Sequence, residues 1–354
     1  MSELVKTRET LQISPDWVRI SMAAAIELGL KPGRIHGCGC GCINLLQNYP
    51  QGCAANCSYC GLARERPGLA EENTFIRVSW PLYPTDLVAE SIGQKERVTN
   101  GGVGRVCIAQ VHDGRAYRDL VDMTRRVRSA APEVPISALV SAGLLDEERL
   151  AVIQAAGADI IGIGLDGASR SVFHDTRGGG VRGPHDWDHH WKIARAARRM
   201  FGPLKVNFHV VVGLGETDRE LVELFYRLLR EQIAAYLFSF NPEPDTAMQD
   251  VPRAPIRRLR HIQLVKHLIE KEGLSAEAIM FDGEGNITSI DAPEVVSGAT
   301  DSGVPFMTNG CPNRKGEVAC NRPYGSYRPG EEFRDYPFQP TREDVATIRA
   351  QMQP

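Results

Sequence analysis

Three cysteines spaced C-x3-C-x2-C, at Cys53, Cys57 and Cys60, constrain this chain more than any other feature of its sequence. Their three thiolates converge within one short loop. A 4Fe–4S cube has four irons, so a loop that supplies three cysteines leaves one iron open to a small molecule. The spacing therefore predicts an iron–sulfur cluster with a vacant coordination position, where chemistry can occur.

Two other uses of clustered cysteines fit the sequence less well. Structural zinc usually takes two C-x2-C-like pairs, and the extra cysteines nearby stand in a C-x-C-x-C run that common zinc motifs do not use. A disulfide framework is disfavoured because a chain of 354 residues can bury its own core and because residues 1–12 are too polar for a signal peptide. We therefore expect reduced thiols that serve as metal ligands.

Composition limits the class of protein. A chain that is 42% hydrophobic, with a net charge of −3, is typical of a globular protein with a substantial core. The slight negative charge argues against a broad nucleic-acid surface, although it leaves room for a single RNA-modifying site. No apolar run is long enough to cross a bilayer. We expect a cytoplasmic protein with neither a membrane nor a nucleic acid as partner. In such a protein nine cysteines are reduced ligands rather than bridges, which agrees with an oxygen-sensitive cluster.

Hydrophobic periodicity predicts an α/β fold. An amphipathic helix is expected at 14–28, behind Ser14 and Pro15, and strands alternate with helices from residue 86 onwards. The expected helices are 86–96, 117–129, 146–156, 186–201, 217–232 and 256–272, and the expected strands are 105–110, 136–140, 159–165, 206–213 and 235–240. Such alternation implies parallel pairing with right-handed crossovers. We predict a complete or partial parallel (β/α) TIM-type barrel, with its chemistry at the carboxyl ends of the strands.

The same pattern divides the chain into three regions. Residues 1–48 are expected to hold a cap helix and a cysteine-rich loop, and residues 49–280 the barrel. Residues 281–354 are rich in glycine, proline and aromatics, so we expect an irregular, cysteine-containing extension that ends in a helix at 341–352 and packs across the barrel.

Five more cysteines suggest a second metal site. Cys38, Cys40 and Cys42 alternate with glycines, which predicts a loop rather than a strand and favours a metal site over a flexible hinge so close to the cluster motif. Cys311 and Cys320 stand in a loop punctuated by glycine and proline, far along the chain. The two groups suggest one site built from both ends of the chain, with five thiols competing for four places.

Polar side chains lie in or just after several predicted strands. They are Gln110, His112, Ser141, Asp166, Asn207 and His209. Because a buried polar group is costly without a partner, their clustering favours a ligand, although an ordinary core hydrogen bond is an equal alternative for each one. Cys107 lies within one of these strand patterns and is expected to be a core thiol.

The cysteine loop, with Tyr59 before its last cysteine, resembles that of the radical S-adenosylmethionine (SAM) superfamily. In that family the open iron is chelated by the amine and carboxylate of SAM. Residues 209–217 resemble the V-x-G-L-G-E segment of biotin synthase, whose strand and glycine turn, here Gly213 and Gly215, pass beside the adenosine. The alternative for this segment is a plain strand-to-helix turn.

Two further resemblances to biotin synthase concern SAM itself. Leu165-Asp166 resembles the Leu-Asp pair that reaches the ribose hydroxyls, a role that suits a carboxylate acceptor. Arg177 would present its guanidinium to the methionyl carboxylate, or pair with a nearby acid instead. The expected cofactor contacts are Tyr59, Gln110, Ser141, Asp166, Arg177, Gly213 and Gly215.

The segment G-C-P…C-N-R-P-Y around Cys311 and Cys320 resembles the two-protein lipoyl synthases, which are biotin-synthase-like enzymes that act as a pair and carry an auxiliary 4Fe–4S cluster. Cys38, Cys40 and Cys42 do not match individual ligands of that family. The resemblance implies that the first cluster cleaves SAM to methionine and a 5′-deoxyadenosyl radical, which removes hydrogen from an acyl chain that acid–base groups cannot activate. The auxiliary cluster would then donate sulfur.

The implied substrate is an octanoyl chain, amide-linked to a lysine of a lipoyl-carrier protein. The implied partners are a paralogous lipoyl synthase subunit and a ferredoxin or flavodoxin electron donor. Three alternatives remain: biotin-synthase-like sulfur insertion into a free small molecule with a 2Fe–2S cluster, a radical mutase or maturase, and a non-catalytic iron–sulfur carrier or scaffold. The polar strand ends and the V-x-G-L-G-E segment weigh against the scaffold.

Overall fold

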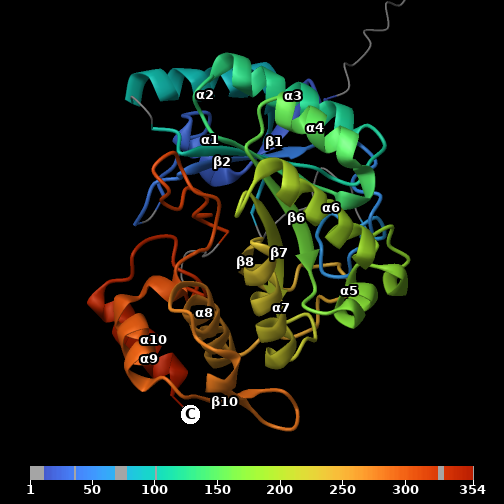
Figure 1. The fold of residues 1–354 in the computed structure, drawn as a ribbon. Helices are drawn as coiled ribbons and strands as arrows, with labels where there is room; N and C mark the ends of the chain where they lie inside the picture. The colour runs from blue at the N-terminus through green and yellow to red at the C-terminus, as the bar shows by residue number, and fades with distance from the viewer. Residues whose placement is uncertain (1–11, 36, 68–77, 100–101, 326–330, 354) are drawn as a thin grey trace, which may run out of the picture.

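The protein is described by a computed structural model that covers residues 12–35, 37–67, 78–99, 102–325 and 331–353 (Figure 1). Almost all of the polar stretch at 1–12 therefore lies outside the described residues. The described helices include none with the length and hydropathy that a bilayer crossing needs.

One eight-stranded sheet organises the molecule, in the order β3-β1-β2-β4-β5-β6-β7-β8. Six neighbouring strands are parallel: β2 (Cys42–Gln47), β4 (Arg105–Ala109), β5 (Ile136–Val140), β6 (Ile160–Asp166), β7 (Val206–Val212) and β8 (Ala234–Ser239). At one edge β1 (Trp17–Ile20) pairs antiparallel with both β2 and β3 (Leu82–Pro84). Within the described chain the sheet stays open between β3 and β8. The predicted α/β class is confirmed, in the form of a partial barrel.

Helices cover the outer face of this sheet (Figure 1). The six that were predicted are α2 (Thr85–Thr99), α3 (Ala116–Ala130), α4 (Glu147–Ala155), α6 (Trp187–Phe201), α7 (Asp218–Glu231) and α8 (Ile256–Lys271). Local capping explains several of their starts, because the side chains of Asp146 and Asp186 accept backbone N–H groups at α4 and α6, and Thr217 forms a capping box with Glu220 at α7. Their apolar sides pack on the strands to form the core.

The prediction of one helix at 14–28 was wrong over its first half, which forms strand β1, and helix α1 occupies only Met22–Glu27. Val18 and Ile20, both fully buried, point to the core from β1. Over so short a segment, the apolar residues fit both the helical and the strand periodicity. The segment forms a strand because it pairs with β2, which is remote in sequence. A short helix, α5 (Arg170–Thr176), was not predicted.

The C-terminal extension is more regular than expected. It begins with a hairpin, β9 (Ile279–Phe281) and β10 (Ile287–Ile290), continues with α9 (Pro293–Ser302) and ends with α10 (Arg342–Met352), close to the helix predicted at 341–352. Its apolar side chains pack against α8 in a separate cluster. The boundaries at residues 48 and 280 remain a prediction, since β1 and β2 from the first region pair with the main sheet.

A buried arginine holds part of the extension to α8. Arg260 is fully buried, and its guanidinium donates hydrogen bonds to the carbonyl oxygens of Phe333 (2.5 Å) and Arg334 (2.8 Å) and to Oε1 of Gln351 (2.8 Å). Burial lowers the pKa of the Arg260 guanidinium, as expected for a cation removed from water. The extension is therefore held by donors as well as by apolar contacts.

We expect Arg260→Leu to lower the free energy of unfolding by about 2–4 kcal/mol, because the carbonyl oxygen of Phe333 and Oε1 of Gln351 both lose this donor. Lys271→Leu, at the exposed last residue of α8, is the control and should change little. Denaturant unfolding of anaerobically purified protein measures both, and proteolysis within 331–340 reports detachment of the extension. Equal stability of the two variants would contradict this role.

Candidate functional site

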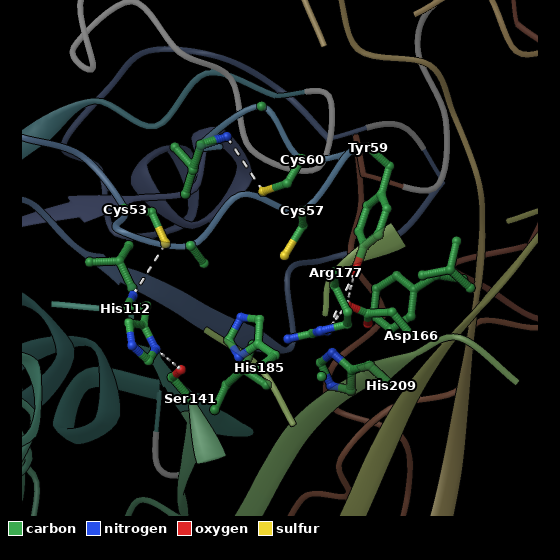
Figure 2. Close-up of a pocket in the computed structure, with 18 of the residues that line it drawn as sticks. Cys53, Cys57, Tyr59, Cys60, His112, Ser141, Asp166, Arg177, His185 and His209 are labelled. Carbon is green, nitrogen blue, oxygen red and sulfur yellow. Dashed lines mark hydrogen bonds and ion pairs between the residues drawn. The ribbon is translucent and has the colours of Figure 1, made fainter. Parts of the chain in front are cut away.

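A cavity of about 240 Å³ opens at the carboxyl ends of the parallel strands (Figure 2). Eight of the predicted site residues line it: Cys53, Cys57, Tyr59, Cys60, Gln110, Ser141, Asp166 and Arg177. They come from the cysteine loop, from the ends of β4, β5 and β6, and from the end of α5. The structure therefore brings together side chains that are spread over more than a hundred residues of sequence.

Backbone hydrogen bonds fix the cysteine loop, which follows β2. The N–H groups of Ala54 and Ser58 donate to the carbonyl oxygens of His112 and Thr176, each at 2.8 Å. Two of the sulfurs also accept backbone N–H groups, with 3.3 Å between Sγ of Cys53 and N of His112, and 3.4 Å between Sγ of Cys60 and N of Leu62. Such donors stabilise thiolate ligands of iron–sulfur clusters. The loop and its donors fit a 4Fe–4S cluster held by three cysteines.

The thiols of this loop are protonated in the absence of a metal. Burial raises the pKa of Cys57 to about 11 and also raises the pKa values of Cys53 and Cys60. A bound cation must therefore displace their protons, as is general for cysteine ligands. In the described part of the chain no three His, Cys, Asp or Glu side chains surround one point closely enough to hold a single metal ion, and this includes the three cysteines of the loop.

An ion pair joins this loop to the sheet. The carboxylate of Asp166 accepts hydrogen bonds from the Tyr59 hydroxyl and from the Arg177 guanidinium (Figure 2). Asp166 has φ of 61°, at an irregularity in the register between β6 and β7 that turns its side chain. Burial opposes the charge on Arg177, but Tyr59 and Asp166 raise its pKa above the usual range. Of the two roles predicted for Arg177, the structure shows the pairing with an acid.

Several polar atoms around the cavity are buried without a hydrogen-bond partner among the described residues. They are Nε2 of Gln110, Nε of Arg177 and Nδ1 of His185. Oε1 of Gln110 is occupied, because it accepts the N–H of Ser141 at 3.0 Å. Unpartnered buried polar atoms are costly and indicate a ligand that completes them.

His185 was missed by the sequence analysis. It lies in the loop before α6 and its ring contacts the edges of His112 (5.4 Å between centroids) and His190 (5.3 Å). The available signal was a histidine between Gly183-Pro184 and Asp186, which begins α6. Burial, followed by the nearby Arg177 charge, lowers the pKa of both His112 and His185. These imidazoles are therefore neutral at pH 7.

The segment after β8 was also missed. Phe240, Asn241 and Glu243 line the cavity directly after β8, the edge strand of the main sheet. Polar residues after a strand were the signal that identified Gln110 and Ser141, and the same reasoning applied to β8 would have found Asn241.

The glycine turn after β7 is placed apart from the cavity lining. Gly213 and Gly215 have φ of 109° and 113°, which requires glycine. The Glu216 carboxylate closes the turn by accepting the N–H groups of Gly213 (2.8 Å) and Leu214 (2.9 Å), and it pairs with Arg258 at 3.1 Å. Contact of these glycines with adenosine stays a prediction.

The outlying cysteines separate into two groups. Cys42, the first residue of β2, lies with Cys311 and Cys320 at the end of the strand away from the cavity. Cys38 and Cys40 instead lie beside Glu27, whose negative charge together with burial raises the pKa of both thiols. Cys40 is also a neighbour of Cys320, and the metal site shared by the five thiols stays a prediction.

Cys107 and Asn207 differ from their expected environments. Cys107, predicted to be a core thiol, is only partly buried, and the thiols of Cys320 and Cys311 are its neighbours. The fully buried Asn207 lies outside the cavity lining, with its Nδ2 3.7 Å from Sγ of Cys311. His209, two residues later on β7, does line the cavity.

Comparisons with known proteins agree with this geometry. A family model of the radical SAM superfamily matches residues 48–228, about half of the chain. The biotin synthase of Cutibacterium acnes is 28% identical over 231 residues, which cover 62% of this chain and 59% of that protein. The lipoyl synthase of Enterobacter sp. (strain 638) is 23% identical over 255 residues, which cover 66% and 73%.

Two further comparisons set the extent of the similarity. The chain spans about half the length of some of the biotin synthases it matches, for example 48% of the one from Saccharopolyspora erythraea. The crystal structure of methylornithine synthase superposes with a TM-score of 0.48 at 14% identity, covering 70% of this chain and 66% of that chain.

We expect Cys53→Ala, Cys57→Ala and Cys60→Ala each to lose about four bound irons per chain, one cubane, because each removes an iron ligand. Ser58→Ala, inside the same loop, is the control for disturbance of the backbone and should keep its iron. Iron and sulfide analysis after anaerobic reconstitution measures the loss. Full iron content in all three cysteine variants would contradict the assignment.

Proposed function

The chain belongs to the radical SAM superfamily, and from that premise we propose that it is a lipoyl synthase-type sulfurtransferase. It would replace an unactivated C–H bond of a protein-bound octanoyl chain by a C–S bond. The observation that supports sulfur insertion is the gathering of Cys42, Cys311 and Cys320 inside the same partial barrel as the first cysteine loop. A radical mutase or maturase of the same fold would need no sacrificed sulfide.

Cys53, Cys57 and Cys60 would hold the first cluster, and the unpartnered donors of Gln110 and Arg177 would bind SAM beside it. When bound, the cluster and SAM supply the one-electron chemistry by which a hydrogen atom of the substrate moves to C5′ of the deoxyadenosyl group. No side chain needs to act as acid or base, and the cavity contains neutral imidazoles.

The remaining wall of the cavity suits an acyl chain. Leu46, Leu139, Val211 and Phe238 line it from four different strands. Apolar walls exclude water from the site, which protects a reactive carbon radical from side reactions. The side chains thus provide a polar end for the cosubstrate and an apolar end for a hydrocarbon.

The proposal includes the substrate and the partners. The octanoyl chain would be carried on a lysine of a lipoyl-carrier protein, a paralogous lipoyl synthase subunit would act on the same chain, and a ferredoxin or flavodoxin would supply electrons. Sulfur would come from an auxiliary 4Fe–4S cluster. We place the reaction in the cytoplasm, without a membrane or a nucleic acid as partner.

A second candidate is biotin-synthase-like insertion of sulfur into a free small molecule. It is supported by the similarity to the biotin synthase of Cutibacterium acnes, which is 28% identical over the matched residues. The two candidates differ in the form of the substrate, carrier-bound or free. They also differ in the second cluster, because a 2Fe–2S cluster would accompany the biotin-synthase-like reaction.

We expect the reduced enzyme, supplied with SAM and an octanoylated carrier protein, to produce 5′-deoxyadenosine and a sulfur-bearing octanoyl chain, with free octanoate as the control substrate. Mass spectrometry of the carrier, with and without the paralogous subunit, measures the product. Deoxyadenosine without any sulfur-bearing chain in either arm would overturn the lipoyl synthase proposal. An absence of SAM cleavage would favour a non-catalytic scaffold.

Asp166 offers a second test of the cofactor site. Asp166→Asn keeps the shape of the side chain but removes its charge, and we expect the affinity for SAM to fall about tenfold, equivalent to about 1.4 kcal/mol for one charge-assisted hydrogen bond. Asp175→Asn, exposed on α5, is the matched control. Equilibrium binding of SAM measures the change, with iron content unaltered. A loss of iron together with SAM binding would instead show that Asp166 serves only to anchor the cysteine loop.

A further inference from the structure

A second group of thiols lies inside the partial barrel at the end of β2 away from the cavity. Cys42 is the first residue of β2, and Cys107 is the third residue of β4. Cys311 and Cys320 come from the extension, whose loops run beside β2 (Figure 1). The contacts of Asn44 and the backbone of the extension bring these four cysteines to one place.

Asn44 marks the centre of this group. Its Oδ1 lies 3.6 Å from Sγ of Cys42 and 3.8 Å from Sγ of Cys320, so both sulfurs face the same atom. Asn44 is also the direct neighbour of Cys107 across the β2–β4 pairing. Because paired residues of parallel strands point to the same side of a sheet, the Cys107 thiol faces the inside together with Asn44.

The extension delivers its two cysteines as one unit. The N–H groups of Ala319 and Cys320 both donate to the carbonyl oxygen of Cys311, at 3.0 and 3.2 Å. A Cβ on Gly310 would lie 2.2 Å from the carbonyl oxygen of Cys320, so only glycine permits this approach. On the sheet, Nδ2 of Asn207 meets Sγ of Cys311 at 3.7 Å.

Two arginines surround the four thiols. Arg105 is almost fully buried, and its guanidinium donates to Oγ of Ser137 (3.0 Å) and to the carbonyl oxygen of Pro312 (2.7 Å), next to Cys311. Arg322 follows Cys320 by two residues and donates to the carbonyl oxygens of Asn309 (2.8 Å) and Leu237 (3.2 Å). Each arginine also has an acidic partner, because Arg105 donates to the Asp159 carboxylate at 3.0 Å and Arg322 lies 3.6 Å from the Asp335 carboxylate. The two guanidinium groups nevertheless lie beside the thiols, which suits the net negative charge of a cluster held by four thiolates.

Cys38 and Cys40 have different contacts, although Cys40 is also a neighbour of Cys320. The Cys40 thiol donates to the carbonyl oxygen of Cys42 at 3.0 Å, and its side chain packs within the hydrophobic core. The Glu27 carboxylate, which is held by Lys95, accepts the backbone N–H of Cys40 at 3.3 Å. A negative neighbour is unsuited to a cluster that already carries negative charge.

We propose that Cys42, Cys107, Cys311 and Cys320 hold the auxiliary 4Fe–4S cluster, with Arg105 and Arg322 beside it, and that Cys38 and Cys40 are not ligands. The role of this cluster as a sulfur donor rests on the proposed function. Its position and its ligands rest only on the contacts described above. Four cysteine ligands were predicted for this cluster. In this assignment the fourth ligand is Cys107 of β4, and Cys42 is the only ligand from the glycine-rich run at 38–42.

The location places the proposed cluster across the barrel interior from the cysteine loop. β2 begins at Cys42 and leads to the loop of Cys53, and its six residues extend over roughly 17 Å. The thiol of Cys311 contacts Tyr236, whose ring lies 6.3 Å from that of His209, a residue of the cavity. A substrate in the cavity would therefore have the first cluster on one side and the auxiliary cluster on the other.

We expect Cys42→Ala, Cys107→Ala, Cys311→Ala and Cys320→Ala, each in the full chain reconstituted anaerobically, to lose about four irons while keeping the first cluster. Cys38→Ala and Cys40→Ala are the matched controls and should keep both clusters. Iron and sulfide analysis and Mössbauer spectroscopy count the clusters, and SAM-dependent release of deoxyadenosine shows that the first cluster and the fold are intact.

Cys107→Ser provides a variant with little risk to folding. Its oxygen can replace a thiolate, so we expect the cluster to remain with a shifted electron paramagnetic resonance spectrum after reduction. Retention of two unaltered clusters in both Cys107 variants, or loss of one in Cys38→Ala or Cys40→Ala, would overturn this ligand set. Wild-type protein with a single cluster would overturn it as well. Two clusters without any sulfur insertion would instead refute only the proposed function.

Discussion

The cost of placing polar groups inside a barrel governs this structure. An apolar core would hold the sheet together without Asp166, Arg177 or Arg105. These charges are tolerated in the interior because Asp166 pairs with Arg177 and Arg105 pairs with Asp159. Asp166 and Arg177 compensate one another and, through Tyr59, fasten the cysteine loop to β6. The loop has little regular structure of its own, so its thiols take their positions from this attachment and from the backbone of His112 and Thr176.

The interior of the sheet is polar at both ends and apolar between them. At the carboxyl end stand the cysteine loop, Gln110 and neutral imidazoles, and at the amino end stand Asn44, Arg105 and a second group of thiols. The hydrophobic core lies mainly between the sheet and the helices that cover its outer face. The open edge at β8 is where the extension enters, and Arg260 and the apolar face of α8 hold it there. Stability and chemistry are thus assigned to opposite faces of one sheet.

Much of the fold was predictable because its signals are local. The strands β4 to β8 and the helices between them follow periodicities of two and 3.6 residues, and capping by Asp146, Asp186 and Thr217 sets several helix starts. β1 was misjudged because its pairing with β2 and β3 is remote in sequence. His185 was missed because no periodicity marks a single histidine in a loop, and only the packing of α5 and α6 beside the strand ends brings it to the cavity.

The sequence alone determined the chemistry at the first site, because three cysteines within eight residues must lie together whatever the rest of the chain does. It could not determine which of the other thiols share a second place. Cys38 and Cys42 are only four residues apart, yet one lies beside the Glu27 carboxylate and the other beside Cys320. Cys107 and Cys320 are separated by about two hundred residues, yet they are neighbours in the structure. Two tertiary contacts bring them together: β2 pairs in parallel with β4, and the extension packs beside these strands. Proximity in the chain fixes a ligand set only when the loop is too short to separate its members, and beyond that length the packing of the sheet decides.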